Sequence, residues 1–187
     1  DNINISEVII NEANFSLLKG NFKKLSVNTK NKFSNKKIII NNSDIFLKNN
    51  LSEITSIIKI SNATLFFDEK KLLNFLDFEG KVFNIPFRLN YQHTFDSKRN
   101  KKIEIEANDL RLKIINENFK LDENLTYGTN NISVLNSTIN TKYNFFDQVI
   151  KFESNNSRIQ NSKVNYNGRL AINPFDLDLE INLDNYR

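Results

Sequence analysis

The chain has 187 residues, of which 39% are hydrophobic and 26% are charged, so it is long enough for one ordinary domain with a modest core. The formal net charge is only +4 and basic residues are interleaved with acidic ones, which argues against a nucleic-acid surface. The chain has no Cys, which excludes disulfides and thiolate metal sites, and no apolar run long enough to predict a membrane-spanning helix. It also has no Met and therefore no initiator residue, so we expect residues 1–187 to form a single segment of a larger protein.

A short element recurs along the chain from its beginning. Two apolar residues at alternate positions precede a mostly polar pair, and two more apolar residues at alternate positions follow it, as around Glu12-Ala13 and Asn42-Ser43. The clear copies are Val8, Ile10, Phe15 and Leu17; Ile38, Ile40, Ile45 and Leu47; Ile58, Ile60, Leu65 and Phe67; and Ile103, Ile105, Leu110 and Leu112. Weaker copies contain Ile132, Val134 and Ile139, and Ile159, Val164 and Tyr166.

Two backbone geometries explain this spacing. If the central pair is a two-residue turn, the apolar residues on its two sides pair across a hairpin and share one face. If the pair contains a bulge inside one longer strand, the extra residue resets the alternation and restores the same face. The hairpin is the preferred interpretation, and both geometries predict one continuous apolar face.

Strict alternation of apolar and polar residues marks further strands. Phe83, Ile85, Phe87, Leu89 and Tyr91 alternate with mostly polar residues, as do Leu177, Leu179, Ile181 and Leu183 near the end of the chain. Polar stretches at 92–102 and 116–131 predict exposed loops. The sequence therefore predicts an all-β fold, a largely antiparallel curved sheet with one apolar face.

Residues that could carry catalysis are scarce. His93 is the one histidine and falls in a predicted loop, where we expect a solvated or hydrogen-bonded side chain. The row Asp176, Asp178 and Glu180 alternates along a strand, which is typical of a solvent-facing surface, although Ca²⁺ binding or a carboxylate pair for glycoside hydrolysis are alternatives. We therefore predict a protein that is not an enzyme and has no cofactor or metal.

Three segments resemble the AsmA-like and TamB-like proteins of the bacterial envelope. IKISNATLFF (58–67) looks like their repeated turns with Ala in place of the usual Gly, and GKVFNIPFRLNY (80–91) is similar to their Gly-x-apolar-x-x-Ile-Pro strands. YNGRLAINPFDLDLEINL (166–183) resembles their Gly-x-apolar-x-apolar-x-Pro-Phe segments. The resemblance implies a periplasmic β-sheet curled like a taco, with an apolar concave side. It also implies a parent protein anchored in the inner membrane and a role in moving phospholipid between membranes. The scarcity of Gly departs from the family pattern and leaves the subfamily open.

The expected function is a lipid-handling groove, with acyl chains lying on the apolar face and neighbouring β-segments of the parent chain extending it. Contact with a membrane would be made by parts outside this segment, and no nucleic acid is expected. The predicted groove-lining residues are Ile10, Phe15, Ile40, Ile45, Ile60, Leu65, Phe67, Phe87, Ile105, Leu110 and Leu179. The alternative is a structural or adhesive β-sandwich whose apolar face is simply its own core.

Overall fold

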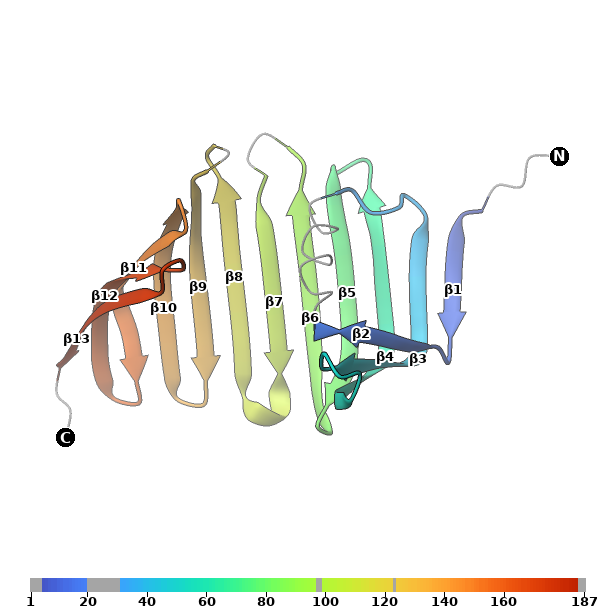
Figure 1. The fold of residues 1–187 in the computed structure, drawn as a ribbon, viewed down its shortest axis with the longest axis horizontal. Helices are drawn as coiled ribbons and strands as arrows, with labels where there is room; N and C mark the ends of the chain where they lie inside the picture. Colours follow the sequence, from blue (N-terminus) through green and yellow to red (C-terminus); the bar gives the residue numbers. More distant parts are fainter. Residues whose placement is uncertain (1–4, 20–30, 97–98, 123, 185–187) are drawn as a thin grey trace. The chain divides into compact units, whose positions relative to one another are not determined.

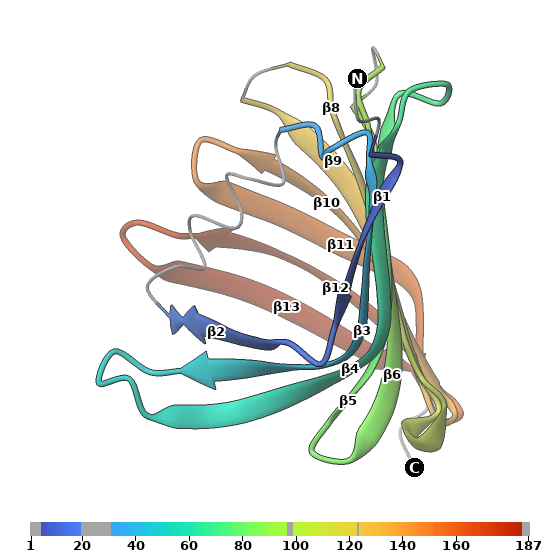
Figure 2. The ribbon, with the colours of Figure 1, turned by 90° about the vertical axis from the view of Figure 1, so that its right-hand side faces the viewer.

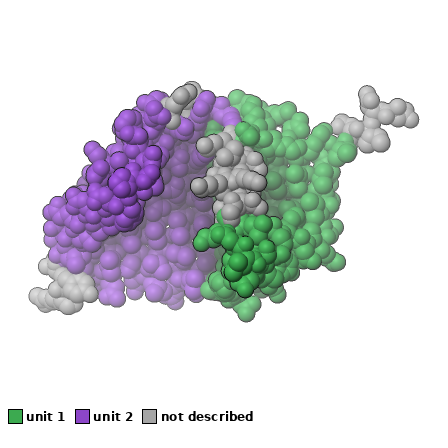
Figure 3. Space-filling view, viewed as in Figure 1, with its two compact units in different colours: residues 1–94 green, residues 95–187 purple. Residues whose placement is uncertain are grey.

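The computed structural model describes residues 5–19, 31–96, 99–122 and 124–184. Within these residues the regular elements are β-strands, apart from short 3₁₀ turns such as η2 (Asn108–Leu110). The contacts group the chain into two compact units, residues 1–94 and 95–187 (Figure 3). Each unit is an open, curved and mostly antiparallel sheet, so the predicted fold class is confirmed.

Unit 1 is a sheet in the order β1-β3-β4-β5-β6, and β2 also pairs with β3 (Figure 1). Strands β1 and β2 run parallel to β3, one along each half of it, whereas the later neighbours are antiparallel. The strands are β1 (Glu7–Asn11), β2 (Asn14–Leu18), β3 (Lys37–Lys48), β4 (Ile54–Asp68), β5 (Leu73–Val82) and β6 (Ile85–Thr94).

The second and third copies of the repeated element are bulged long strands and not the preferred hairpins, and the first copy is divided into two strands, β1 and β2, which pair with successive halves of β3. Both β3 and β4 continue through the central pair, and Asn42 takes a positive φ of 47°. On β4, Ile60 lies opposite Gly80 but Asn62 lies opposite Glu79, so β4 has one residue more than β5. Such an extra residue bends a strand, and Figure 2 shows β3 and β4 bending sharply part-way along.

Unit 2 is a meander in which each strand pairs antiparallel with the next one along the chain. Here the later copies of the repeated element are true hairpins, with tight turns at Leu135-Asn136 and Gln160-Asn161. The strands are β7 (Lys101–Ala107), β8 (Leu112–Lys120), β9 (Thr126–Val134), β10 (Ser137–Phe146), β11 (Val149–Ile159), β12 (Ser162–Ala171) and β13 (Asp176–Asp184).

The predicted loops are shorter than the polar stretches that suggested them. Strand β6 extends to Thr94 and β7 begins at Lys101, so most of the stretch 92–102 that is described lies in strands. In the stretch 116–131, β8 ends at Lys120 and β9 begins at Thr126. Some of these polar residues, such as Glu117 and Thr129, lie on the water-facing side of the sheet, which accepts them.

A serine hydroxyl satisfies the backbone at two bulges. At the bulge in β3, the Ser43 hydroxyl accepts a hydrogen bond from the Ala13 amide at 2.9 Å and donates to the Asn41 carbonyl at 2.8 Å. Strand β11 has an extra residue between Ser154 and Ser157, and the Ser157 hydroxyl accepts from the Asn140 amide at 2.9 Å. The hydroxyls replace ladder bonds that the bulges interrupt, and both serines are buried.

Two glycines of unit 2 lie under aromatic rings. Gly128 pairs with Tyr143 across β9 and β10, and Gly168 pairs with Phe152 across β11 and β12. A Cβ at Gly128 would lie 2.3 Å from the Tyr143 ring, and one at Gly168 would lie 2.6 Å from the Phe152 ring. Each ring therefore covers the surface that its glycine leaves bare, which stabilises the strand pairs.

Candidate functional site: an apolar sheet face in each unit

The apolar residues of unit 1 share one face of its sheet. The register pairs Ile10 with Ile40, Phe15 with Ile45, and Leu65 with Leu76, and directly paired residues point to the same side. Eight predicted lining residues lie on this face: Ile10, Phe15, Ile40, Ile45, Ile60, Leu65, Phe67 and Phe87. The bulges keep these residues on one face. In a regular strand, residues three apart point to opposite sides, but across the bulge in β3 both Ile40 and Ser43 point to the apolar face.

This face is largely covered by unit 1 itself. Ile60, Ala63 and Phe78 are buried at 4%, 2% and 9% exposure, and Phe15 and Ile40, from opposite sides of the bend, both pack against them. The bend therefore folds the apolar face onto itself. Most of the other predicted lining residues of unit 1 are half-buried.

Described residues 31–36 cover the end of this face. The Phe33 ring lies 6.3 Å from the Tyr91 ring, and the Phe33 amide donates a hydrogen bond of 2.7 Å to the Asn74 side-chain oxygen. Asn74 in turn donates to the Asn31 carbonyl at 2.8 Å and is fully buried. These polar and aromatic contacts therefore cover this end of the apolar face.

His93 belongs to this closed end. The sequence predicted a loop residue that is solvated or hydrogen-bonded, but His93 lies in β6 opposite Asn74 and is only 5% exposed, so it is neither in a loop nor solvated. The sequence-based prediction was wrong because the alternation of β6 extends through polar residues as far as Thr94.

The apolar face of unit 2 is built from the same alternation. Ile105 pairs with Ile114, which pairs with Ile132, which pairs with Ile139, giving an isoleucine row across four strands. Leu179 lies on this face opposite Gly168. Leu110 does not, because it lies in the turn η2 between β7 and β8 and is 44% exposed. The register there pairs Ala107 with Leu112, so the predicted pairing of Ile105 with Leu110 was wrong.

The end of this face at β13 is the most exposed. The aliphatic row Leu177, Leu179, Ile181 and Leu183 retains exposures of 51%, 45%, 54% and 49%. No second sheet covers these side chains among the residues that the structure describes. Of these four residues only Leu179 was among the predicted groove-lining residues, although the alternation of all four predicts the same face.

Polar side chains interrupt the apolar face of unit 2. The Asn116 amide donates a hydrogen bond of 3.2 Å to the Tyr143 hydroxyl, and the Thr141 and Tyr166 hydroxyls lie 2.5 Å apart. These four residues, which we call the polar band, lie on β8, β10 and β12, on the same face as the isoleucine row and the aliphatic row of β13. The face is therefore not the uniform aliphatic track that the alternation suggested.

The opposite faces carry the charges. Lys113 contacts both Glu104 and Glu106 at 2.6 Å, and the hydrogen bond from Lys113 lowers the pKa of Glu104 despite some desolvation. In unit 1 the hydrogen bonds from Arg88 lower the pKa of Asp77 in the same way. These are surface ion pairs that keep the polar faces in water.

The acidic row of β13 also lies on the polar face. Asp178 is paired with Arg169 in the register and Asp176 accepts a hydrogen bond from Arg169 at 3.1 Å, so the row is partly neutralised by β12. The described part of the chain brings together no group of three or more His, Asp or Glu side chains suited to a metal ion. Among the same residues, no helix has the length and hydropathy that crossing a bilayer requires.

Comparisons of the chain with protein-family models, with curated proteins and with solved structures give no match.

Proposed function

We propose that this chain binds phospholipid through its acyl chains and acts as a segment of a lipid-conducting β-groove. The observation that supports this most directly is the aliphatic row of β13, whose four side chains keep about half of their surface exposed. Contiguous exposed apolar surface is uncommon on soluble proteins and usually marks an interaction site. The proposal places the lipid on the apolar face of unit 2, because the corresponding face of unit 1 is occupied by its own side chains.

The expected binding energy is adequate for a lipid carrier. Complete burial of a methylene group contributes about 0.8 kcal/mol, and an open face covers roughly half of a chain, so one acyl chain of ordinary length gains about 5–6 kcal/mol. A binding free energy in this range holds the lipid on the face but is not so large that the lipid stays fixed in one place. The lipid can then move along the sheet.

The proposed biological setting follows from the resemblance to AsmA-like and TamB-like proteins. The parent protein would lie in the periplasm, anchored in the inner membrane, and would conduct phospholipid between the inner and outer membranes to maintain the envelope. Neighbouring β-segments of the parent chain would extend the groove. Cell fractionation of the tagged parent protein tests this location, and recovery in the cytosol would contradict it.

The test of lipid binding is mass spectrometry of organic extracts from the purified chain. We expect co-purifying phospholipid in the wild type and its loss in Leu179→Asp and Ile181→Asp, because each places a charge in the acyl path. Both side chains are about half exposed, so the variants should fold. Asn182→Asp is the matched control, since it adds the same charge to the opposite face of the same strand.

A lipid-free wild type, or equal loss of lipid in Asn182→Asp, would contradict the proposal. The structural or adhesive β-module is then the better reading, and the buried cluster of Ile60, Ala63 and Phe78 favours it for unit 1. Variants at Ile60 are not suitable probes of lipid binding, because a charge at a residue with 4% exposure unfolds the cluster.

A further inference from the structure

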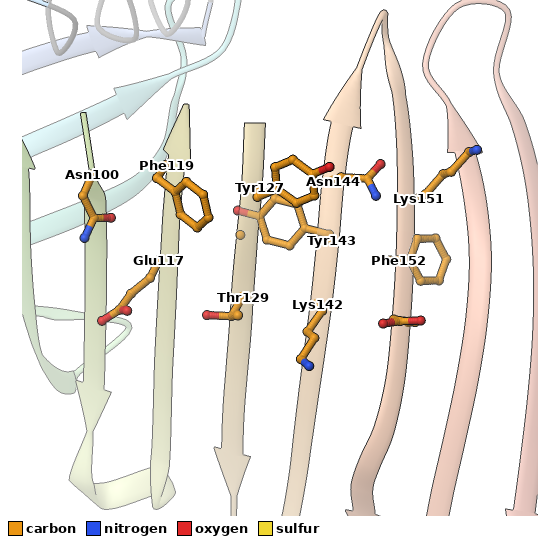
Figure 4. A pocket seen from close by; sticks show the side chains of 12 residues that line it. Asn100, Glu117, Phe119, Tyr127, Thr129, Lys142, Tyr143, Asn144, Lys151 and Phe152 are labelled. Carbon is orange, nitrogen blue, oxygen red and sulfur yellow. The ribbon is translucent and has the colours of Figure 1, made fainter. Parts of the chain in front are cut away.

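Two rows of side chains on the polar face of unit 2 border an open hollow. The register across β8, β9, β10 and β11 aligns the members of each row. One row is Glu117, Thr129, Lys142 and Glu153, and the other is Phe119, Tyr127, Asn144 and Lys151. The hollow has a volume of about 610 Å³, and Figure 4 shows the side chains around it. This volume falls in the range of roughly 300–1,000 Å³ that is typical of ligand sites.

The floor of the hollow is main chain. Gly128, Tyr143 and Phe152 also border it, but they alternate with the row residues and so point toward the apolar face. The Tyr143 ring confirms this, since it occupies the space beside Gly128 on that face. The hollow therefore lies on the side opposite the proposed lipid site.

An aromatic platform forms one part of the rim. The Phe119 and Tyr127 rings have centroids 6.1 Å apart and an interplanar angle of 18°, so they present nearly parallel faces. Their residues are 42% and 37% exposed although they lie on the charged face. Exposed rings of this kind stack against flat ligand surfaces, such as nucleobases or the C–H face of a sugar ring.

The rest of the rim offers unused hydrogen-bonding groups. The side chains of Thr129, Lys142, Asn144, Lys151 and Glu153 make no hydrogen bond or ion pair with any residue that the structure describes. Their donors and acceptors surround a platform that is flat and apolar. A ligand with many hydroxyl groups and one apolar ring face is complementary to both features.

The charge of the rim decides between the two kinds of stacking ligand. The rim carries two lysines, Lys142 and Lys151, and two glutamates, Glu117 and Glu153, so its formal charges are mixed in sign. A nucleic-acid strand needs a basic groove that follows its phosphates, and this rim has none. We propose that the hollow binds a neutral oligosaccharide, with sugar rings stacked on Phe119 and Tyr127 and hydroxyl groups bonded to the neighbouring row residues.

The experiment titrates the whole chain with cellohexaose, maltohexaose and chitohexaose while amide chemical shifts are recorded. We expect at least one of these sugars to shift amides of β8 to β11, and Tyr127→Ala to weaken that binding about tenfold, the usual effect of one stacked ring. Tyr127→Phe should retain the binding because it keeps the ring. Phe175→Ala is the control, since it removes a ring that is 76% exposed outside the hollow.

Three outcomes would overturn the proposal. The first is the absence of shifts with all three sugars at about 10 mM, where a site with a Kd of ~1 mM would be mostly filled. The second is sugar binding that Tyr127→Ala and Phe175→Ala weaken equally. The third is a preference for single-stranded oligothymidylate over the sugars, which would identify the platform as a base-stacking surface. None of them bears on lipid binding, which the β13 variants test separately.

Discussion

Ser43 in unit 1 and Ser157 in unit 2 each supply a hydrogen bond at a bulge that interrupts the backbone ladder of their own sheet. Each hydroxyl accepts a hydrogen bond from a backbone amide: Ala13, between β1 and β2, for Ser43, and Asn140 in β10 for Ser157. Ser157 is 1% exposed, so water cannot replace its hydroxyl. A single oxygen atom therefore decides whether the bulge is fully hydrogen-bonded.

Ser157→Ala should lower the free energy of unfolding by about 1–3 kcal/mol, because it leaves the half-buried Asn140 amide without its hydrogen-bond partner. Urea denaturation of the chain measures this change. Ser133→Ala is the control, since Ser133 is an exposed serine in β9. A loss in Ser157→Ala no larger than in the control would contradict the account of the bulge.

The charged triad of β7 and β8 shows how a strand pair keeps one face in water. Lys113 lies between Glu104 and Glu106 at 2.6 Å from each, and it is directly opposite Glu106 in the register. The hydrogen bond from Lys113 lowers the pKa of Glu104, and the two carboxylates raise the pKa of Lys113. These contacts are exposed, so their effect on stability is small.

Lys113→Gln should raise the pKa of Glu104 toward its ordinary range, because it removes the positive charge and replaces the charged ammonium donor with a neutral amide. A lowered carboxyl pKa stabilises the fold above the unfolded pKa, and that contribution is lost as the pH falls through the folded pKa. The stability difference between wild type and variant should therefore be present at neutral pH and vanish in acid. Carboxyl-carbon NMR titration measures the pKa directly.

Asp77 supplies the reciprocal control for this titration. Its pKa is lowered by hydrogen bonds from Arg88 and Asn90, whereas the pKa of Glu104 is lowered by Lys113 and Lys102. Lys113→Gln should leave the titration of Asp77 unchanged, whereas Arg88→Gln should raise the pKa of Asp77 and leave Glu104 unchanged. A shift of both carboxyl groups in either variant would show a general loosening of the fold and not the local contacts.

Across the molecule, burial is uneven. Ile60, Ala63 and Phe78 on β4 and β5 are nearly inaccessible, whereas all nine residues of β13 are exposed. Local stability follows such differences in packing. The two units each contain the same kind of apolar face, covered by a bend in unit 1 and left partly open in unit 2.

Amide hydrogen exchange should reflect this contrast. We expect the slowest exchange in β4 and β5, around Ile60 and Phe78, and the fastest exchange among strands in β13, which has few packed neighbours. Addition of phospholipid should slow exchange in β12 and β13 more than in β4. Equal protection of β13 and β4 without lipid would contradict the burial contrast.

The alternation of apolar and polar residues by itself determined the fold class and the composition of each face. Leu177 to Leu183 alternates so strictly that both the strand and its dry face follow from the sequence, and Ile40, Ile60 and Phe87 were placed correctly on the apolar face of unit 1. This success has a local cause, because a strand has a period of two whatever it pairs with.

Only the tertiary structure decided how the backbone passes the repeated pairs and which parts of the apolar faces are covered. The pairs Asn42-Ser43 and Asn161-Ser162 are alike in sequence, yet the first lies in a bulged strand and the second belongs to a hairpin turn and its following strand. Leu110 entered a turn, and His93 became buried against Asn74. A bulge and a hairpin turn satisfy the same local backbone preferences, so pairing with strands that are distant in the sequence selects between them. Burial depends on neighbouring residues that no local sequence pattern specifies.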